Sequence, residues 1–321
     1  MASEMKTALI TGGYGYIGSH VTKALKKAGW RTIVVDSKSK SQTHEYTDMF
    51  YPCDIGAPEL SFLFGKVKID VVFHLAGLIE VGTSEKCPSE YYQVNVGGTI
   101  NLLNEMAIHH VKNIVFSSSA GVYGSGNQKF LETDECHPTS VYGRNKLMCE
   151  QILTDMQKEN INSICLRYFN VGGADPDGEM GENHEPETHL IPRILQNLNN
   201  FTLYGDDYET PDGTCIRDFI HVSDVADAHV ASAEYLLKNQ KSDIFNIGSG
   251  TGCSNKQIVD TIEKVTGQKV NITYGPRRAG DPAMLVSNIS KAQELLNFTP
   301  KFNLENIIST AYDWHLKHGD N

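Results

Sequence analysis

The sequence predicts an α/β protein with a doubly wound parallel sheet and a smaller C-terminal lobe of mixed α/β structure. Short apolar runs alternate with helical patterns through the first half of the 321 residues. A glycine-rich turn joins the first apolar run to the first helical pattern. Alternating strands and helices form a parallel sheet that is covered on both faces. A glycine turn at the first crossover of such a sheet is typical of the Rossmann fold.

The expected elements follow one another in order along the chain. Near-continuous apolar runs predict strands that are buried on both faces of the sheet. Segments with apolar residues at helical spacing predict the helices between them. The expected strands cover residues 7–11, 32–36, 70–75, 113–117 and 163–167, and the expected helices cover residues 18–28, 94–109 and 140–157.

A turn-rich stretch at residues 172–178 interrupts this alternation, with the sequence Gly-Gly-Ala-Asp-Pro-Asp-Gly. Glycine, proline and aspartate together favour turns over regular elements, so this stretch is the best candidate for a domain boundary. We expect a Rossmann domain over residues 1–171 and a substrate-binding domain over residues 172–321. A late strand near residues 244–248 could return to the first sheet.

Composition and charge exclude several classes of function. The formal net charge of −11, without a basic stripe, argues against a nucleic-acid-binding surface. No apolar run approaches the roughly 20 residues of a membrane-spanning helix. Seven scattered cysteines without a C-x-x-C pair predict reduced thiols in a cytoplasmic protein. Cys136-His137 could be a pair of metal ligands, but no second pair occurs at zinc spacing, so we expect no metal site.

Gly12, Gly15 and Gly18 form the glycine-rich turn. Such glycines allow a tight turn and let backbone amides approach a pyrophosphate at the helix N-terminus. A glycine triplet alone is a weak signal, but this one has the required strand before it and helix after it. The turn therefore predicts a bound dinucleotide.

Asp36 ends the second expected strand and indicates which dinucleotide binds. A carboxylate at this place can accept hydrogen bonds from the adenosine ribose hydroxyls and would repel a 2′-phosphate. The cofactor is therefore expected to be NAD. Lys38 and Lys40 lie nearby and keep NADP open as an alternative.

Tyr142 and Lys146 are four residues apart in an expected helix, so their side chains lie on the same face. A neighbouring ammonium favours the phenolate and lowers the pKa of a tyrosine from its usual value of about 10. A general base that works near neutral pH needs such a shift. The pair predicts a nicotinamide redox site in which tyrosine is the acid/base.

Ser119 closes a serine triplet at the expected carboxyl end of a strand, where open α/β sheets bind ligands. It could bond a substrate hydroxyl and pass a proton to Tyr142. A serine triplet alone more often caps a helix or forms a loop, and a Y-x-x-x-K match alone is common by chance. Their order along one sheet, after the glycine turn and Asp36, favours the catalytic interpretation.

Longer stretches carry a resemblance to a known family. The chain resembles the extended short-chain dehydrogenase/reductases and, among them, the UDP-glucose 4-epimerases. The similarity covers both halves of the chain, and the stretches from the second half are the more specific ones. The matching stretches are TGGYGYIGSH, DVVFHLAG, YYQVNVGGT, FSSSAGVYG, YGRNKLMCEQIL, RYFNVGGADP, GTCIRDFIHVSDVADAH, FNIGSG and PRRAGDPAM.

The resemblance implies an NAD-dependent 4-epimerase that interconverts UDP-glucose and UDP-galactose by transient oxidation at C4 of the sugar. It implies a homodimer formed through the helices that end in His110 and Gln157. It assigns catalysis to Ser119, Tyr142 and Lys146. The implied NAD-binding residues are Gly12, Gly15, Tyr16, Ile17, Gly18, Asp36, Asp54, Ile55, Leu75, Ala76, Gly77, Asn95, Ser117, Tyr142, Lys146 and Tyr168.

The resemblance also implies a UDP-sugar site built largely by the second half of the chain. Ser119 and Tyr142 would face the sugar, and further residues would hold the diphosphate, the uracil and the ribose. These further residues are Asn170, His189, Leu190, Thr202, Tyr204, Arg217, Arg278 and Asp281.

Several departures from the family pattern leave alternatives open. Ile79 replaces a lysine beside the diphosphates, and Gly121 replaces a threonine after the catalytic serine. Leu285 holds the position that senses the substituent at sugar C2. Epimerisation of UDP-N-acetylglucosamine, UDP-xylose or UDP-glucuronate therefore stays open, as does a non-catalytic nucleotide sensor. A 4,6-dehydratase is disfavoured, because Ala120-Gly121 stands where that chemistry needs Asp-Glu.

Overall fold

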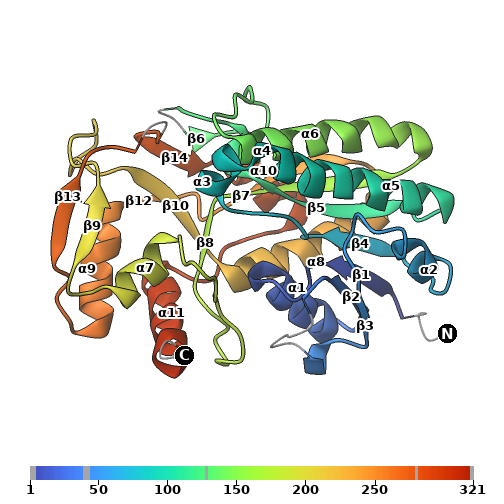
Figure 1. The fold of residues 1–321 in the computed structure, drawn as a ribbon, viewed down its shortest axis with the longest axis horizontal. Helices are drawn as coiled ribbons and strands as arrows, with labels where there is room; N and C mark the ends of the chain where they lie inside the picture. The colour runs from blue at the N-terminus through green and yellow to red at the C-terminus, as the bar shows by residue number, and fades with distance from the viewer. Residues whose placement is uncertain (1–4, 39–43, 127–128, 279–280, 319–321) are drawn as a thin grey trace.

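The computed structural model describes residues 5–38, 44–126, 129–278 and 281–318, so Lys40 lies outside the described residues. Its main feature is a seven-stranded parallel sheet with the strand order β11-β7-β5-β4-β1-β2-β3 (Figure 1). The strands are β1 (Thr7–Thr11), β2 (Arg31–Asp36), β3 (Met49–Pro52), β4 (Val71–His74), β5 (Asn113–Ser119), β7 (Asn162–Tyr168) and β11 (Asp243–Ile247).

Side chains of each central strand enter two different cores, one on each face of the sheet. In β1, Ala8 and Ile10 join one buried cluster, whereas Leu9 joins the other. Successive strand residues point to opposite faces, so a strand between two helical layers must be apolar at every position. This explains why the strands were visible in the sequence as continuous apolar runs.

Helices cover both faces of the sheet, as Figure 1 shows. The first core receives side chains from α1 (Tyr16–Lys27), α8 (Val222–Asn239) and α10 (Ser290–Leu296). The second core receives side chains from α2 (Leu60–Phe64), α5 (Gly98–Ile108) and α6 (Val141–Asp155). Two short helices, α3 (Val81–Lys86) and α4 (Pro88–Tyr91), lead into a π-helical stretch at Tyr92–Gly97 that continues into α5.

A second lobe lies beside the carboxyl edge of this sheet, at the left of Figure 1. Its helices α7, α9 and α11 share a third apolar core with side chains of β9 and β10. The helices are α7 (Leu190–Gln196), α9 (Asn255–Thr266) and α11 (Leu304–His318), and the strands are β6 (Lys129–Phe130), β8 (Asn170–Gly172), β9 (Phe201–Tyr204), β10 (Ile216–His221), β12 (Gly252–Ser254), β13 (Ile272–Gly275) and β14 (Met284–Ser287).

The chain crosses between the two lobes more than once. β11 pairs in parallel with β7, so the late strand does return to the first sheet. α8 follows β10 of the second lobe and packs on α1. The domain boundary between residues 171 and 172 remains a prediction. Two elements that follow it in the sequence belong to the first lobe: β11 joins the sheet, and α8 covers one face of it.

The expected fold class is confirmed, while the element boundaries differ by a few residues. The helix expected at 18–28 begins at Tyr16, and the one expected at 94–109 is split between the π-helix and α5. β3 was not expected, because its sequence Met-Phe-Tyr-Pro is half-exposed at the edge of the sheet. Within the described part of the chain, no helix has the length and apolarity needed to span a bilayer.

Among the residues whose burial the structure describes, four histidines have exposed fractions of 0–3%: His20, His74, His221 and His229. Burial disfavours the charged imidazole and lowers their pKa values, to about 3 for His74 and His221 and to about 4 for His20 and His229. The unfolded chain binds these protons near pH 6.5, so acid favours unfolding.

We therefore expect the free energy of unfolding to fall as pH drops from 6.5 towards 4, by up to about 1.4 kcal/mol per pH unit for each histidine. Urea unfolding at several pH values measures this slope. His229→Asn should make this dependence on pH less steep, because one proton fewer is taken up on unfolding. His137→Gln is the control, because that side chain is 75% exposed. An unchanged slope in His229→Asn would contradict the assignment.

Candidate active site

The glycine turn between β1 and α1 brings backbone segments into close contact. A Cβ atom on Gly18 would lie 2.0 Å from the Gly12 carbonyl oxygen, so no larger residue fits without displacing backbone. Gly12 itself has a φ of +70°, in the left-handed region that favours glycine. The helix N-terminus is thus open to a close approach by an anionic group.

Asp36 ends β2 beside this turn. Its carboxylate accepts hydrogen bonds from the backbone amides of Tyr14 and Lys38, both at 2.9 Å. These two donors fix the direction of the carboxylate at the edge of the sheet. Asp36 therefore joins the glycine turn at the place where the sequence predicts the adenosine ribose.

The other side of the expected cofactor site follows β4. Asn95, in the π-helix, accepts a hydrogen bond from the Leu78 amide at 2.7 Å and donates one to the Leu78 carbonyl at 3.0 Å. It thereby shapes the loop of Leu75, Ala76 and Gly77. The π-helix places Asn95 against this loop, a feature that helical periodicity does not reveal.

Asp54 and Ile55 lie after β3, where they shape a turn. Asp54 accepts a hydrogen bond from the Gly56 amide at 2.7 Å. Ile55 packs against Gly98, where a Cβ atom would lie 2.7 Å from the Ile55 side chain. Ile17 packs against the core below α1, and the Tyr16 hydroxyl donates to the Gly173 carbonyl at 2.5 Å.

Ser119 and Tyr142 are brought together by a close approach of α6 to the turn after β5. A Cβ atom on Gly143 would lie 2.5 Å from the Gly121 carbonyl oxygen, so glycine is needed next to Tyr142. Ser140 caps α6 by accepting from the Gly143 amide at 3.0 Å. The Ser119 hydroxyl then forms a hydrogen bond with the Tyr142 hydroxyl.

The expected lowering of the Tyr142 pKa by Lys146 is not what the surroundings of Tyr142 produce. Burial raises the pKa of Tyr142 to about 12, and the hydrogen bond from Ser119 only partly opposes this shift. The Lys146 ammonium lies 5.7 Å from the centre of the Tyr142 ring and donates to the Ser117 carbonyl at 2.6 Å. Burial lowers the pKa of Lys146 to about 8.

A buried ion pair fixes α6 to the sheet beneath these residues. Arg167 of β7 donates two hydrogen bonds to Glu150 of α6, at 3.0 and 2.7 Å, and both side chains are only 4% exposed. The Ser118 hydroxyl donates a further hydrogen bond to Glu150. The network fixes the position of α6, which carries Tyr142 and Lys146, relative to β5 and β7. Tyr168, at the end of β7, bonds His229 at 2.5 Å.

The second lobe brings several of the expected substrate residues together. Arg217 of β10 lies 3.5 Å from Asp281 and pairs in register with Leu285 of β14. The Arg278 guanidinium lies 4.7 Å from the centre of the Tyr204 ring. Cationic, apolar and aromatic groups are thus close to one another on this side of the lobe.

Thr202, Asn170, His189 and Leu190 occupy separate elements around this group. Thr202 of β9 contacts the Thr273 hydroxyl at 3.2 Å, and Asn170 begins β8. Leu190 begins α7, directly after His189. Burial alone would lower the pKa of His189, but hydrogen bonds to Glu182 and Glu187 outweigh it and raise the pKa to about 10.

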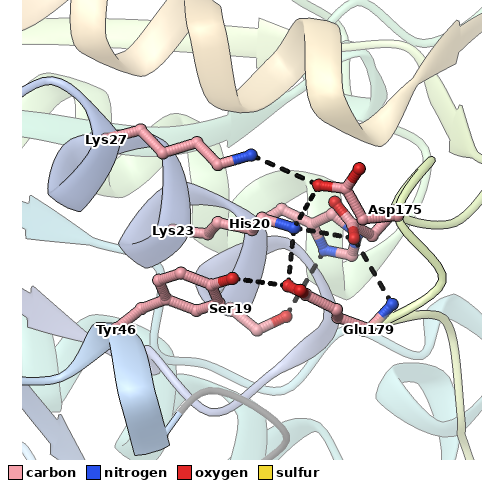
Figure 2. Close-up of polar contacts among 8 residues, drawn as sticks. Ser19, His20, Lys23, Lys27, Tyr46, Asp175 and Glu179 are labelled. Carbon is pink, nitrogen blue, oxygen red and sulfur yellow. Dashed lines mark hydrogen bonds and ion pairs between the residues drawn. The ribbon is translucent and has the colours of Figure 1, made fainter.

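A cluster around Lys23 connects α1 to the loop after β8, and no sequence pattern predicted it. Lys23 is buried, and its ammonium bonds Asp175 at 2.8 Å, Asp177 at 3.0 Å and Glu179 at 2.7 Å. Figure 2 shows this ammonium among the carboxylates, with the Tyr46 hydroxyl on Glu179. The cluster holds the cofactor helix against the segment that leads to His189.

These residues fit a bound NAD. Gly12 and Gly18 allow the turn to pack tightly at the start of α1, where backbone amides can approach a pyrophosphate, and Asp36 stands at the neighbouring strand end. The Ser117 carbonyl takes one of the three Lys146 N–H donors. The remaining donors are available to ribose hydroxyls, in keeping with the expected role of Lys146.

Comparison with known proteins agrees with this arrangement. Residues 8–248 match the model of the NAD dependent epimerase/dehydratase family. The chain belongs to this family. A UDP-glucose 4-epimerase of Halalkalibacterium halodurans is 44% identical over 319 residues, which are 97% of this chain and 96% of the relative.

Solved structures of this epimerase/dehydratase family superimpose over nearly the whole chain. A UDP-glucose 4-epimerase from Stenotrophomonas maltophila, with bound NAD and formylated UDP-arabinopyranose, has a TM-score of 0.94 at 35% identity and covers 99% of both chains. The UDP-Glc/GlcNAc 4-epimerase from Campylobacter jejuni has a TM-score of 0.84 at 36% identity, covering 97% of this chain and 99% of its own.

We expect Glu150→Ala to lower the free energy of unfolding by roughly 3–5 kcal/mol, because it leaves the Arg167 charge buried and unpaired. Urea unfolding measures the loss. Asp155→Ala on the same helix is the matched control, since its pair with Lys158 is 75–81% exposed and should contribute less than about 1 kcal/mol. Equal losses in the two variants would show that the buried pair has no special role.

Proposed function

We propose that this protein is an NAD-dependent 4-epimerase that interconverts UDP-glucose and UDP-galactose. The observation that carries the proposal is the meeting of Ser119 and Tyr142 near Lys146, at the carboxyl edge of the sheet that holds the glycine turn. A non-catalytic sensor has no need for this arrangement. The 44% identity to a UDP-glucose 4-epimerase supports the same activity.

Tyr142 is the proposed acid/base for the sugar 4-hydroxyl. NAD, when bound, supplies the acceptor for the C4 hydride and a positive charge beside the phenol. That charge would oppose the effect of burial, which raises the pKa of Tyr142. Ser119 donates to the Tyr142 oxygen and can relay the proton, while Lys146 adds a second positive charge nearby.

Residues of the second lobe hold the part of the substrate that does not react. Arg217 and Arg278 would bind the diphosphate, and Thr202, Tyr204 and Asp281 would contact the nucleoside. Asn170, His189 and Leu190 would complete the diphosphate side. Binding energy at this remote end keeps the 4-keto sugar in the site while it turns its other face to the cofactor.

Tyr142→Phe is expected to reduce kcat by about 10²–10⁴-fold, because the variant cannot accept the 4-hydroxyl proton. The conversion of UDP-glucose to UDP-galactose measures kcat, and the absorbance of the purified protein reports retained NAD. Cofactor content should stay unchanged. The control is Tyr274→Phe, whose side chain is 49% exposed on β13. Near-normal turnover by Tyr142→Phe would exclude it as the base.

Leu285 leaves the C2 substituent of the sugar as the main alternative, and a relative from Campylobacter jejuni is a UDP-Glc/GlcNAc 4-epimerase. Leu285→Ala is expected to raise kcat/KM for UDP-N-acetylglucosamine relative to UDP-glucose by about tenfold or more, because it makes room beside C2. A panel with UDP-xylose and UDP-glucuronate extends the test. Met284→Ala is the control, since neighbouring strand residues point to opposite faces. An unchanged ratio would exclude Leu285 as the determinant.

We also infer a cytoplasmic homodimer formed through α5 and α6. All seven cysteines are free thiols, in keeping with a reducing compartment. α5 exposes Ile100 and Ile108, at 43% and 64%, and α6 exposes Met148 at 39%. Exposed apolar side chains on adjacent helices are typical of an interface between copies of a chain.

We expect Ile100→Asp to shift the protein from dimer to monomer, because it would bury a carboxylate at the interface. Sedimentation velocity measures the mass. Leu316→Asp is the control, since Leu316 is equally apolar and 64% exposed but lies on α11. A monomeric unmodified protein, or a dimer that Ile100→Asp leaves intact, would contradict this interface.

A further inference from the structure

Two glutamates and two histidines of the segment before α7 bring their ligand atoms together. They are Glu182, His184, Glu187 and His189, called the His/Glu cluster below. One ligand atom from each residue lies within 4.8 Å of the others. Glutamate oxygen and histidine nitrogen are both ligands of transition metals. The four residues lie within an eight-residue stretch of the sequence, with the pattern Glu-x-His-x-x-Glu-x-His.

The two carboxylates of the cluster are withdrawn from water. The Glu182 side chain is 8% exposed, and the Glu187 side chain is 5% exposed. Buried negative charges need a positive partner. The carboxylates of the neighbouring cluster around Lys23 already have a positive partner, because the Lys23 ammonium lies among them (Figure 2). Among the described residues, the ion-pair partners of Glu182 and Glu187 are the two histidines.

The contacts of His184 suit a shared cation better than a hydrogen bond. Its Nδ1 lies 3.2 Å from Glu182 Oε1 and 3.8 Å from Glu187 Oε2, but this buried atom makes no hydrogen bond of good geometry to either carboxylate. Two ligands of one tetrahedral zinc ion lie about 3.3 Å apart, since each is about 2.0–2.1 Å from the metal. His189 Nδ1, at 2.7 and 3.0 Å from the carboxylates, would need to move outward by only a few tenths of an ångström.

The surroundings of the cluster support its carboxylates and give access to it. The Glu187 carboxylate accepts from the backbone amides of Thr188 and His189 at 2.7 and 2.8 Å, and the Trp314 indole donates to the backbone carbonyl of Glu182 at 3.1 Å, which holds the main chain there. Such outer hydrogen bonds orient metal ligands. Glu182, His184 and Glu187 also line a cavity of about 90 Å³ between α7 and α11.

We propose that the His/Glu cluster binds one divalent transition-metal cation, with Zn²⁺ as the preferred ion. Two imidazole nitrogens and two carboxylate oxygens match zinc, whereas calcium and magnesium select oxygen ligands. The cation balances the two buried carboxylates and links the loop before α7 to the start of that helix. The site shares His189 with the proposed diphosphate side of the substrate site, so the test measures metal binding and not epimerase activity.

The test is a Zn²⁺ titration of the full-length, untagged protein after chelation and dialysis. It uses isothermal calorimetry in a mildly alkaline buffer, because metal competes with protons for imidazole nitrogens. One Zn²⁺ per chain and a rise in Tm with Zn²⁺ are expected. Co²⁺ should give a visible absorption band of tetrahedral coordination.

His184→Gln is expected to weaken Zn²⁺ binding at least tenfold and to abolish the Tm shift. His315→Gln is the matched control, because His315 lines the same cavity but lies outside the cluster. Glu187→Gln replaces His184→Gln if that variant does not fold. Failure of the unmodified protein to bind Zn²⁺ stoichiometrically, or equal binding by His184→Gln, would overturn the proposal.

Discussion

The buried ion pair between Glu150 and Arg167 is the interaction on which the arrangement of the active site depends. α6 carries both Tyr142 and Lys146, and its position relative to the sheet is set by this pair and by Ser118. The charges are shielded from water, so neither partner can be lost without leaving the other uncompensated. A charged contact buried below the reacting groups therefore acts on catalysis without touching the substrate.

Polar contacts connect the two lobes, in addition to the apolar cores inside each lobe. Lys23 joins the cofactor helix to three carboxylates of the loop after β8, and the His/Glu cluster follows a few residues later in the same segment. Tyr16 adds a hydrogen bond to Gly173 between these contacts. The substrate side is thus held in place from the same helix whose N-terminus faces the expected pyrophosphate.

The fold could be predicted from the sequence because parallel strands buried on both faces are continuously apolar. Short-range spacing also predicted that Tyr142 and Lys146 share a helix face. The pKa of Tyr142 could not be predicted in this way, because it depends on burial by residues far away in the sequence. For the same reason, β3 at the sheet edge, the π-helix around Asn95 and the Lys23 cluster escaped sequence analysis.

The return of β11 to the first sheet has a consequence for how this architecture can change. A chain cut after β8 would lack an edge strand and the α8 layer over α1, so neither half is a self-contained module. Genetic recombination could therefore not exchange the second lobe as one continuous segment of the coding sequence. New specificity would have to arise by point changes or loop insertions, which fits a scaffold that conserves its topology while its ligands diversify.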